Sequence, residues 1–186
     1  MSDRYLAFAN SNTGRRLVGA LGLPAPLLLE RWSAGRSRPV DGALLLGGEG
    51  NLANAVLPFA NKLTDALFAA REAQFELPRW TAEHGPKLKA LVFDASGLTR
   101  FEQLIELRDF FQPAFKGLDT CPRVVILGRA PESLKDPIAA SVQRSLEGFS
   151  RSLGKEIRRG GNVQLIYVGK GGEAQLEGAL RFFLSP

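Results

Sequence analysis

Residues that could hold a nucleotide fall in three short segments of this chain. The first is GGEGNLAN at 47–54, the second is DASG at 94–97, and the third is the Gly128–Arg129 pair. A dinucleotide-binding turn needs glycines that let the backbone approach a pyrophosphate in front of a helix N-terminus. The candidate cleft residues are therefore Gly47, Gly48, Gly50, Asp94, Ser96, Gly97, Gly128 and Arg129.

The segment at 47–54 keeps only part of such a turn. It lacks the later glycine that lets the strand and the helix close together, and Glu49 would bring a carboxylate toward the phosphate. The sequence therefore favours a glycine-rich turn that joins a strand to a helix, without a nucleotide.

A second phosphate candidate is the SNTG segment at 11–14. It resembles the flavin-phosphate loop of flavodoxins, in which hydroxyls and successive backbone amides form an anion nest, although Arg16 stands at the last hydroxyl position. Because Ser, Asn and Thr are also ordinary helix-capping residues, capping of a short helix at 13–22 is the favoured interpretation.

Composition excludes several other kinds of chemistry. His84 is the one histidine and Cys121 the one cysteine, so a histidine-based triad, a multi-histidine metal site and an internal disulfide are not available. A single cysteine and the lack of a signal-peptide pattern predict a cytoplasmic location. The net charge of +5 is carried by dispersed residues, and no apolar run reaches membrane length, so neither nucleic acid nor membrane is an expected partner.

Strand-like apolar runs alternate with helical patterns along most of the chain. The runs are GALLLGG at 42–48, AQFEL at 73–77, LKALVFDASG at 88–97, RVVILG at 123–128 and NVQLIYVG at 162–169. Helical spacing covers 52–71, 101–118, 137–159 and 173–184. This alternation predicts a three-layer α/β/α fold with a doubly wound parallel sheet, flavodoxin-like or Rossmann-like, of about five core strands in the order 2-1-3-4-5. Residues 1–41 are expected to form an N-terminal arm packed on one domain, 42–186.

The predicted helix at 137–159 resembles the active-site helix of short-chain dehydrogenases/reductases. In that family a Y-x-x-x-K motif precedes a stretch similar to GFSRSLGKE, which stands here at 148–156. The resemblance places the catalytic tyrosine position at Ala139 and the lysine position at Gln143. Alanine has no proton to give and glutamine carries no charge, so the resemblance implies an inactive site with no catalytic residue.

The whole chain resembles the N-terminal domain of bacterial high-molecular-weight 3-oxoacyl-[acyl-carrier-protein] reductases. The matching stretches are GLPAP at 22–26, LERWSAGR at 29–36, GALLLGG at 42–48, LVFDASGLT at 91–99, RVVILGRAPE at 123–132, LEGFSRSLGKEIRRG at 146–160 and LRFFLSP at 180–186. The resemblance implies a non-catalytic segment without a cofactor of its own. Its partner would be a C-terminal ketoreductase domain of the same protein that uses NADH or NADPH. The alternative is a flavin- or nucleotide-binding flavodoxin-like module.

Assembly is the role expected of such a segment. In short-chain reductases the helices that correspond to 101–118 and 137–159 form the main subunit contact, so the resemblance implies a homodimer. The interface candidates are Phe110, Phe111, Phe115 and Phe149. The strand at 163–168 is further expected to lie at an unpaired sheet edge, because LRFFLSP resembles the point at which the reductase fold continues into another strand.

Overall fold

The computed structural model of the protein describes residues 4–23 and 26–186, which fall into two compact units, 1–31 and 32–186. The first unit contains helices α1 (Arg4–Ala9) and α2 (Asn12–Ala20). The hydroxyl of Ser11 accepts a hydrogen bond from the backbone N–H of Gly14 at 3.0 Å, which confirms the capping interpretation of the SNTG segment. Residues 24 and 25 of the GLPAP stretch lie outside the described residues.

The second unit begins before the predicted boundary at residue 42. Val40 is buried, and its N–H donates to the carbonyl of Leu63 at 3.1 Å, so this part of the expected arm belongs with the sheet domain. Packing of residues 1–31 on the domain remains a prediction.

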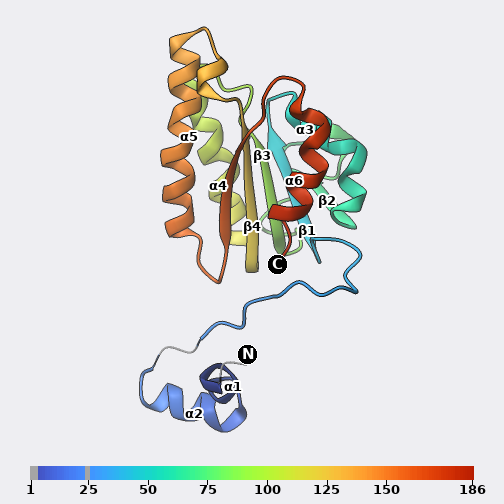
Figure 1. Ribbon diagram of the computed structural model, residues 1–186. Coiled ribbons are helices and arrows are strands. Elements are labelled where there is room, and N and C mark those ends of the chain that lie inside the picture. Colours follow the sequence, from blue (N-terminus) through green and yellow to red (C-terminus); the bar gives the residue numbers. More distant parts are fainter. Residues whose placement is uncertain (1–3, 24–25) are drawn as a thin grey trace. The chain divides into compact units, whose positions relative to one another are not determined.

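The second unit is built on a parallel sheet of five strands. They are β1 (Ala43–Gly48), β2 (Ala66–Ala69), β3 (Leu88–Asp94), β4 (Leu118–Gly128) and β5 (Asn162–Tyr167). Their order is β2-β1-β3-β4-β5, and every pair is parallel, which confirms the predicted doubly wound sheet (Figure 1). Successive apolar side chains of each central strand point to opposite faces of the sheet. Both faces are therefore apolar, and both must be covered.

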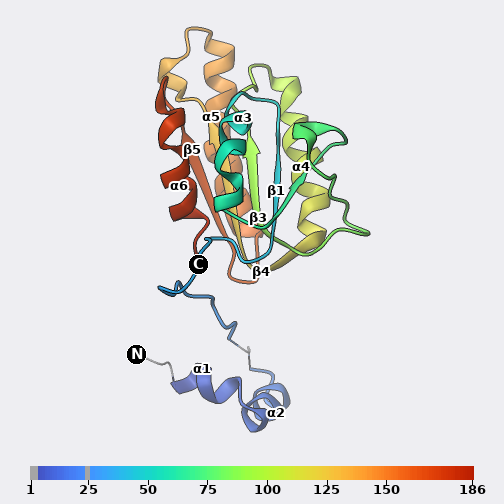
Figure 2. The same ribbon diagram turned by 90° about the vertical axis from the view of Figure 1, so that its right-hand side faces the viewer.

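Helices cover both faces of the sheet and complete the three layers. One face packs against α4 (Ile105–Gly117), which follows η3 (Phe101–Leu104), and against α5 (Pro137–Glu156). The other packs against α3 (Leu52–Val56), η1 (Leu57–Lys62) and α6 (Leu176–Phe183), which follows η5 (Gly172–Gln175) (Figure 2). The short helices η2 (Gln74–Glu76) and η4 (Pro131–Ser133) lie in connections. Within the described ranges, no helix combines the length and apolar character that crossing a membrane requires.

The second strand was predicted at the wrong place. The AQFEL segment at 73–77 contains η2, with positive φ angles of 55° at Ala73, 58° at Phe75 and 55° at Glu76, which exclude an extended strand. The strand is instead β2, inside the region predicted as the end of a helix. The predicted helix at 52–71 therefore ends at Lys62.

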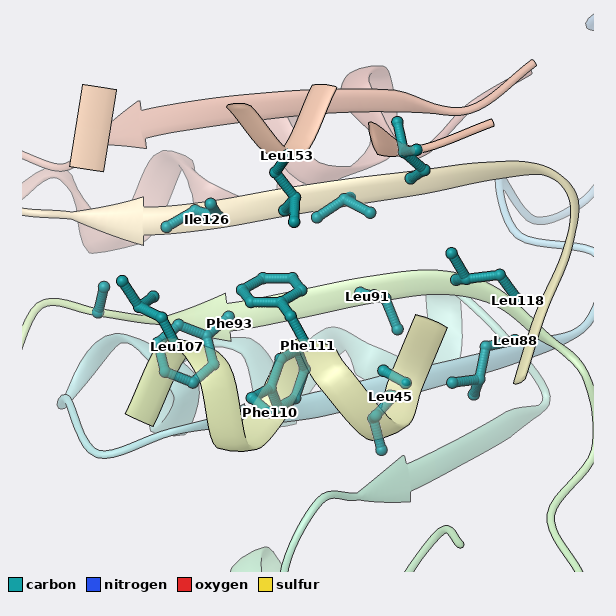
Figure 3. Packing of buried hydrophobic residues seen from close by; sticks show 14 of the residues in the cluster. Leu45, Leu88, Leu91, Phe93, Leu107, Phe110, Phe111, Leu118, Ile126 and Leu153 are labelled. Carbon is teal, nitrogen blue, oxygen red and sulfur yellow. The ribbon is translucent and has the colours of Figure 1, made fainter. Parts of the chain in front are cut away.

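Two of the four phenylalanines expected at an interface belong to the core. Phe110 and Phe111 are 5% and 3% exposed, and their ring centroids lie 4.8 Å and 5.7 Å from that of Phe93 on β3 (Figure 3). They cannot line a subunit contact, because α4 turns them toward the sheet. Phe115 and Phe149 are half-buried and pack against the same cluster.

The strand β5 lies at the edge of the sheet. Among the strands of the described chain it pairs with β4 alone, in the register Arg123 to Asn162 through Gly128 to Tyr167. The outer backbone groups of β5 have no neighbouring strand in the part of the chain that the structure describes, as expected for this segment.

Candidate functional site

The three predicted segments meet at the carboxyl edge of the sheet. The turn at 47–50 follows β1, the turn at 94–97 follows β3, and Gly128 ends β4. The order of the strands reverses between β1 and β3, which is where ligands bind in open α/β sheets. The three segments thus lie together as the sequence predicts, and their role as a binding cleft stays a prediction that depends on what fills this edge.

Asp94 fills the place in front of helix α3. The residue is fully buried, and its Oδ2 accepts the N–H of Ala53 at 2.7 Å, while its Oδ1 accepts the N–H of Ser96 at 2.9 Å. In a dinucleotide site, the N–H groups at this helix end would face the pyrophosphate. Here one of them is bound to a carboxylate of the protein, which would also repel a phosphate.

The loops after β1 and β3 pack directly on each other. A Cβ atom added to Gly50 would lie 2.1 Å from Oγ of Ser96 and 2.3 Å from Oδ1 of Asp94. Gly48 has a φ of 103°, and a Cβ there would lie 2.1 Å from the carbonyl oxygen of Asp94. These glycines let two loops of the protein approach each other, which takes up the space that a ligand's phosphates would need.

Gln143 stands at the position where the family resemblance places a lysine. Its side chain links the segments that follow β3 and β4 by hydrogen bonds. Its side chain is 1% exposed. Its Oε1 accepts the N–H of Arg129 at 2.8 Å, and its Nε2 donates to the carbonyls of Ala95 at 2.7 Å and Leu98 at 2.8 Å. The ends of β3 and β4 are thus held by one neutral amide. Ala139, one turn earlier, is also buried.

Tyr167 is a polar residue of this region that the sequence patterns did not single out. Its hydroxyl donates to the carbonyl of Gln143 at 3.0 Å and lies 3.3 Å from Oε1 of Glu147. Burial, with the nearby Glu147 carboxylate, raises the pKa of Tyr167 to about 12. A catalytic tyrosine needs the opposite shift, so Tyr167 does not replace the missing one. The one feature of the sequence that could have pointed to Tyr167 is its position at the end of the predicted strand that is now β5.

The charged residues at the cleft pair with each other. Arg129 lies 2.9 Å from Glu173 and also donates to the carbonyl of Val168 at 3.2 Å. Across the mouth, Arg71 forms ion pairs with both Glu49 and Glu106. Among the described residues, each of these positive side chains already has an anionic partner, so neither is free to bind a phosphate. The described chain also contains no cluster of three side chains suited to a metal ion.

The space beside the turn after β1 is small. The cavity beside Gly48, bounded by Arg71, Gln74, Phe93 and Phe110 among others, has a volume of about 40 Å³. Pockets for cofactors and drug-sized ligands measure roughly 300–1,000 Å³. The space beside Gly48 therefore cannot admit a dinucleotide in this conformation. Larger hollows, of about 480 Å³ and 170 Å³, lie farther along this edge, beside residues 131–145 and 166–179.

Comparison with known proteins identifies the fold. No protein-family model matches the sequence, and no curated protein is similar to it. Among solved structures, BdcA (YjgI) from E. coli is similar with a TM-score of 0.56 and 15% identity over 80% of this chain and 92% of that chain. BdcA in complex with NADPH is similar with a TM-score of 0.50 and 14% identity over 69% of this chain and 70% of that chain. The protein thus has a Rossmann-like α/β fold that is shared with an NADPH-binding protein.

These comparisons correct the family expectation. The similar structures are BdcA, which belongs to a different, though related, family, so the chain is wrongly identified as the N-terminal domain of a 3-oxoacyl-[acyl-carrier-protein] reductase. The stretches that carried that resemblance lie mostly in parallel strands and in the amphipathic α5. Many doubly wound domains need similar apolar spacing in these elements, and it does not distinguish one reductase family from another.

Proposed function

We propose that the sheet domain is a non-catalytic, reductase-like module that carries out no nicotinamide chemistry and acts by assembly with a second copy of the chain or with a further protein domain. The observation that carries this proposal is the Asp94 carboxylate bound at the N-terminus of α3, with the loops of Gly48 and Gly50 packed on it. Ala139 and Gln143 support it, because neither can donate a proton to a carbonyl or hold a ribose by charge.

Calorimetry with NADH and NADPH tests this proposal. We expect neither nucleotide to bind the wild-type protein in the micromolar range. The Ala139→Tyr, Gln143→Lys double variant should also remain inactive with carbonyl substrates, because chemistry requires a seated cofactor. BdcA, which was solved in complex with NADPH, is the positive control for the titration. Micromolar binding of either nucleotide to the wild-type protein would overturn the proposal.

A nucleotide-binding module is the second candidate function. The similarity to BdcA in complex with NADPH favours it, although at 14% identity that similarity extends to the fold alone. In this case the loops of Gly48 and Asp94 would have to separate when the ligand enters. Saturable NADPH binding, with loss of the Ala53 N–H to Asp94 hydrogen bond, would support this candidate. A bound flavin would instead give a yellow protein that absorbs near about 450 nm.

A further inference from the structure

A second pocket lies at the opposite edge of the sheet, where β4 begins to pair with β5. Its volume is about 540 Å³, within the range of ligand sites. Arg123 starts the paired region of β4 opposite Asn162 of β5, and both line the pocket together with Gln164. Phe182 and Phe183, at the C-terminal end of α6, also line the pocket.

Arg123 is the charged group of this pocket, and it has no anionic partner. Its Nε is buried without a hydrogen-bond partner, and no ion pair joins its guanidinium to any described carboxylate. No aspartate or glutamate is among the described residues that line the pocket. A half-buried guanidinium is stabilised by an anion that accepts two parallel hydrogen bonds, as a carboxylate does.

Two amide side chains extend the polar side of the pocket. Nε2 of Gln164 donates to Oδ1 of Asn162 at 2.8 Å, which fixes both amides on the same strand. This bond leaves Nδ2 of Asn162 as a donor that no hydrogen bond within the described chain uses. The polar side therefore offers hydrogen-bond donors next to a positive charge.

Aromatic side chains form the other side of the pocket. Trp32 and Phe182 are 49% and 74% exposed, and the ring centroids of Phe182 and Phe183 lie 5.1 Å apart in a T-shaped pair. Such large aromatic surfaces are costly to leave in water, and they suit a flat apolar body. Together with Arg123, they match a molecule that is aromatic at one end and anionic at the other.

We propose that this pocket binds a small aromatic carboxylate, with Arg123 on the carboxylate and Trp32, Phe182 and Phe183 around the ring. The site is separate from the carboxyl-edge cleft, and the inference does not depend on the proposed non-catalytic role. The occupant is a free small molecule, because the pocket has the volume of a ligand site and its one charge needs one anionic group.

Titration with 1-naphthoate and with its neutral amide, 1-naphthamide, tests this inference. Both have the same rings, so the difference between their affinities measures the contribution of charge. Trp32 lines the pocket and supplies a fluorescence readout. The other tryptophan, Trp80, is buried in the core cluster under α4 and α5 and does not line the pocket. We expect naphthoate to quench Trp32 saturably and to bind about tenfold more tightly than the amide, and we expect Trp32→Phe to abolish the quenching.

Two variants separate the charge from the ring contact. Arg123→Gln should remove the preference for naphthoate over the amide, whereas Phe182→Ala should weaken both ligands several-fold and keep the preference. Phe182 is exposed, so its removal should not unfold the domain. Arg108→Gln, on α4 and outside the pocket lining, is the matched control and should change neither affinity. Equal binding of the two ligands, an unchanged preference in Arg123→Gln, or amide shifts at the 94–97 turn in place of Asn162 and Gln164 would overturn the inference.

Discussion

Gln143 satisfies three backbone groups from a buried position, so its removal should be costly. In Gln143→Ala, the N–H of Arg129 and the carbonyls of Ala95 and Leu98 lose their partner inside the protein. We expect the free energy of unfolding to fall by about 2–4 kcal/mol. Chemical denaturation measures this change. Gln112→Ala, at an exposed position on α4, is the control and should shift stability by less than about 0.5 kcal/mol.

Asp94 uses both carboxylate oxygens as acceptors, which an amide cannot reproduce. Asp94→Asn keeps the shape of the side chain but turns an N–H₂ group toward the N–H of either Ala53 or Ser96. We expect a loss of about 1–3 kcal/mol in the free energy of unfolding. Asp41→Asn, an exposed substitution of the same chemistry, should be close to neutral. Equal stability of the two variants would mean that the Asp94 contacts are not formed in solution.

Tyr167 should make stability fall at alkaline pH. Its folded-state pKa is raised from 10.0 to about 12, by burial and then by Glu147, so the fold favours the neutral hydroxyl. The stabilisation is therefore fully present below pH 10 and is lost as the pH rises through about 12. Denaturation of the wild type and of Tyr167→Phe across this range should show a stability difference that changes between these two values. A constant difference would contradict the burial of the hydroxyl.

At the scale of elements, strands with continuous apolar runs could be located from the sequence, and β2 could not. Apolar residues recur every three to four positions across η1 into β2, at Leu52, Val56, Phe59, Leu63 and Leu67. Periodicity therefore extends the predicted helix into a four-residue strand. The turn between them depends on Thr64, which is buried and whose hydroxyl donates to the carbonyl of Gly42, 22 residues away in the sequence. Such contacts leave no periodic signal.

Thr64 should therefore control whether β2 forms. Its hydroxyl donates to the carbonyl of Gly42 at 2.6 Å and accepts the N–H of Ala66 at 3.0 Å. Thr64→Val keeps the volume and removes both bonds, which should destabilise the domain by about 1–3 kcal/mol. Hydrogen exchange should show lost protection in β2, while β3 and β4 keep theirs. Uniform loss along the whole sheet would indicate that β2 is not a separate local unit.

For the whole molecule, the order of the strands, and with it the edge at which the turns after β1, β3 and β4 meet, followed from the alternation of elements and from right-handed crossovers. Whether this edge is open to a ligand could not be predicted from the sequence. Asp94 reaches α3 across 41 residues of sequence, and Gln143 reaches Ala95 across 48. The pattern of residues places these groups at one edge but does not say whether they bind a ligand or one another. The same reason explains why Phe110 and Phe111 were expected at a surface.

Self-association through α4 and α5 is the prediction that belongs to the whole molecule. With Phe110 and Phe111 in the core, the exposed apolar residues of this helix pair are Phe101, Ile105 and Ile138, at 53%, 44% and 44% exposure. They lie near the starts of η3, α4 and α5, and an ion pair of 2.7 Å between Arg100 and Asp136 joins these ends. Apolar surface at these helix ends suits a two-fold contact.

Sedimentation of the wild type and of the Ile105→Glu, Ile138→Glu double variant tests this contact. We expect the wild type to form a dimer at high protein concentration and the double variant to remain monomeric, because two buried carboxylates would face each other across the two-fold axis. Phe182→Glu places the same charge on α6, away from the helix pair, and should leave the dimer intact. The two sets of variants should have the same circular dichroism, since all three positions are exposed. A wild type that stays monomeric, or a dimer that Phe182→Glu disrupts and the double variant does not, would show that α4 and α5 are not the surface of assembly.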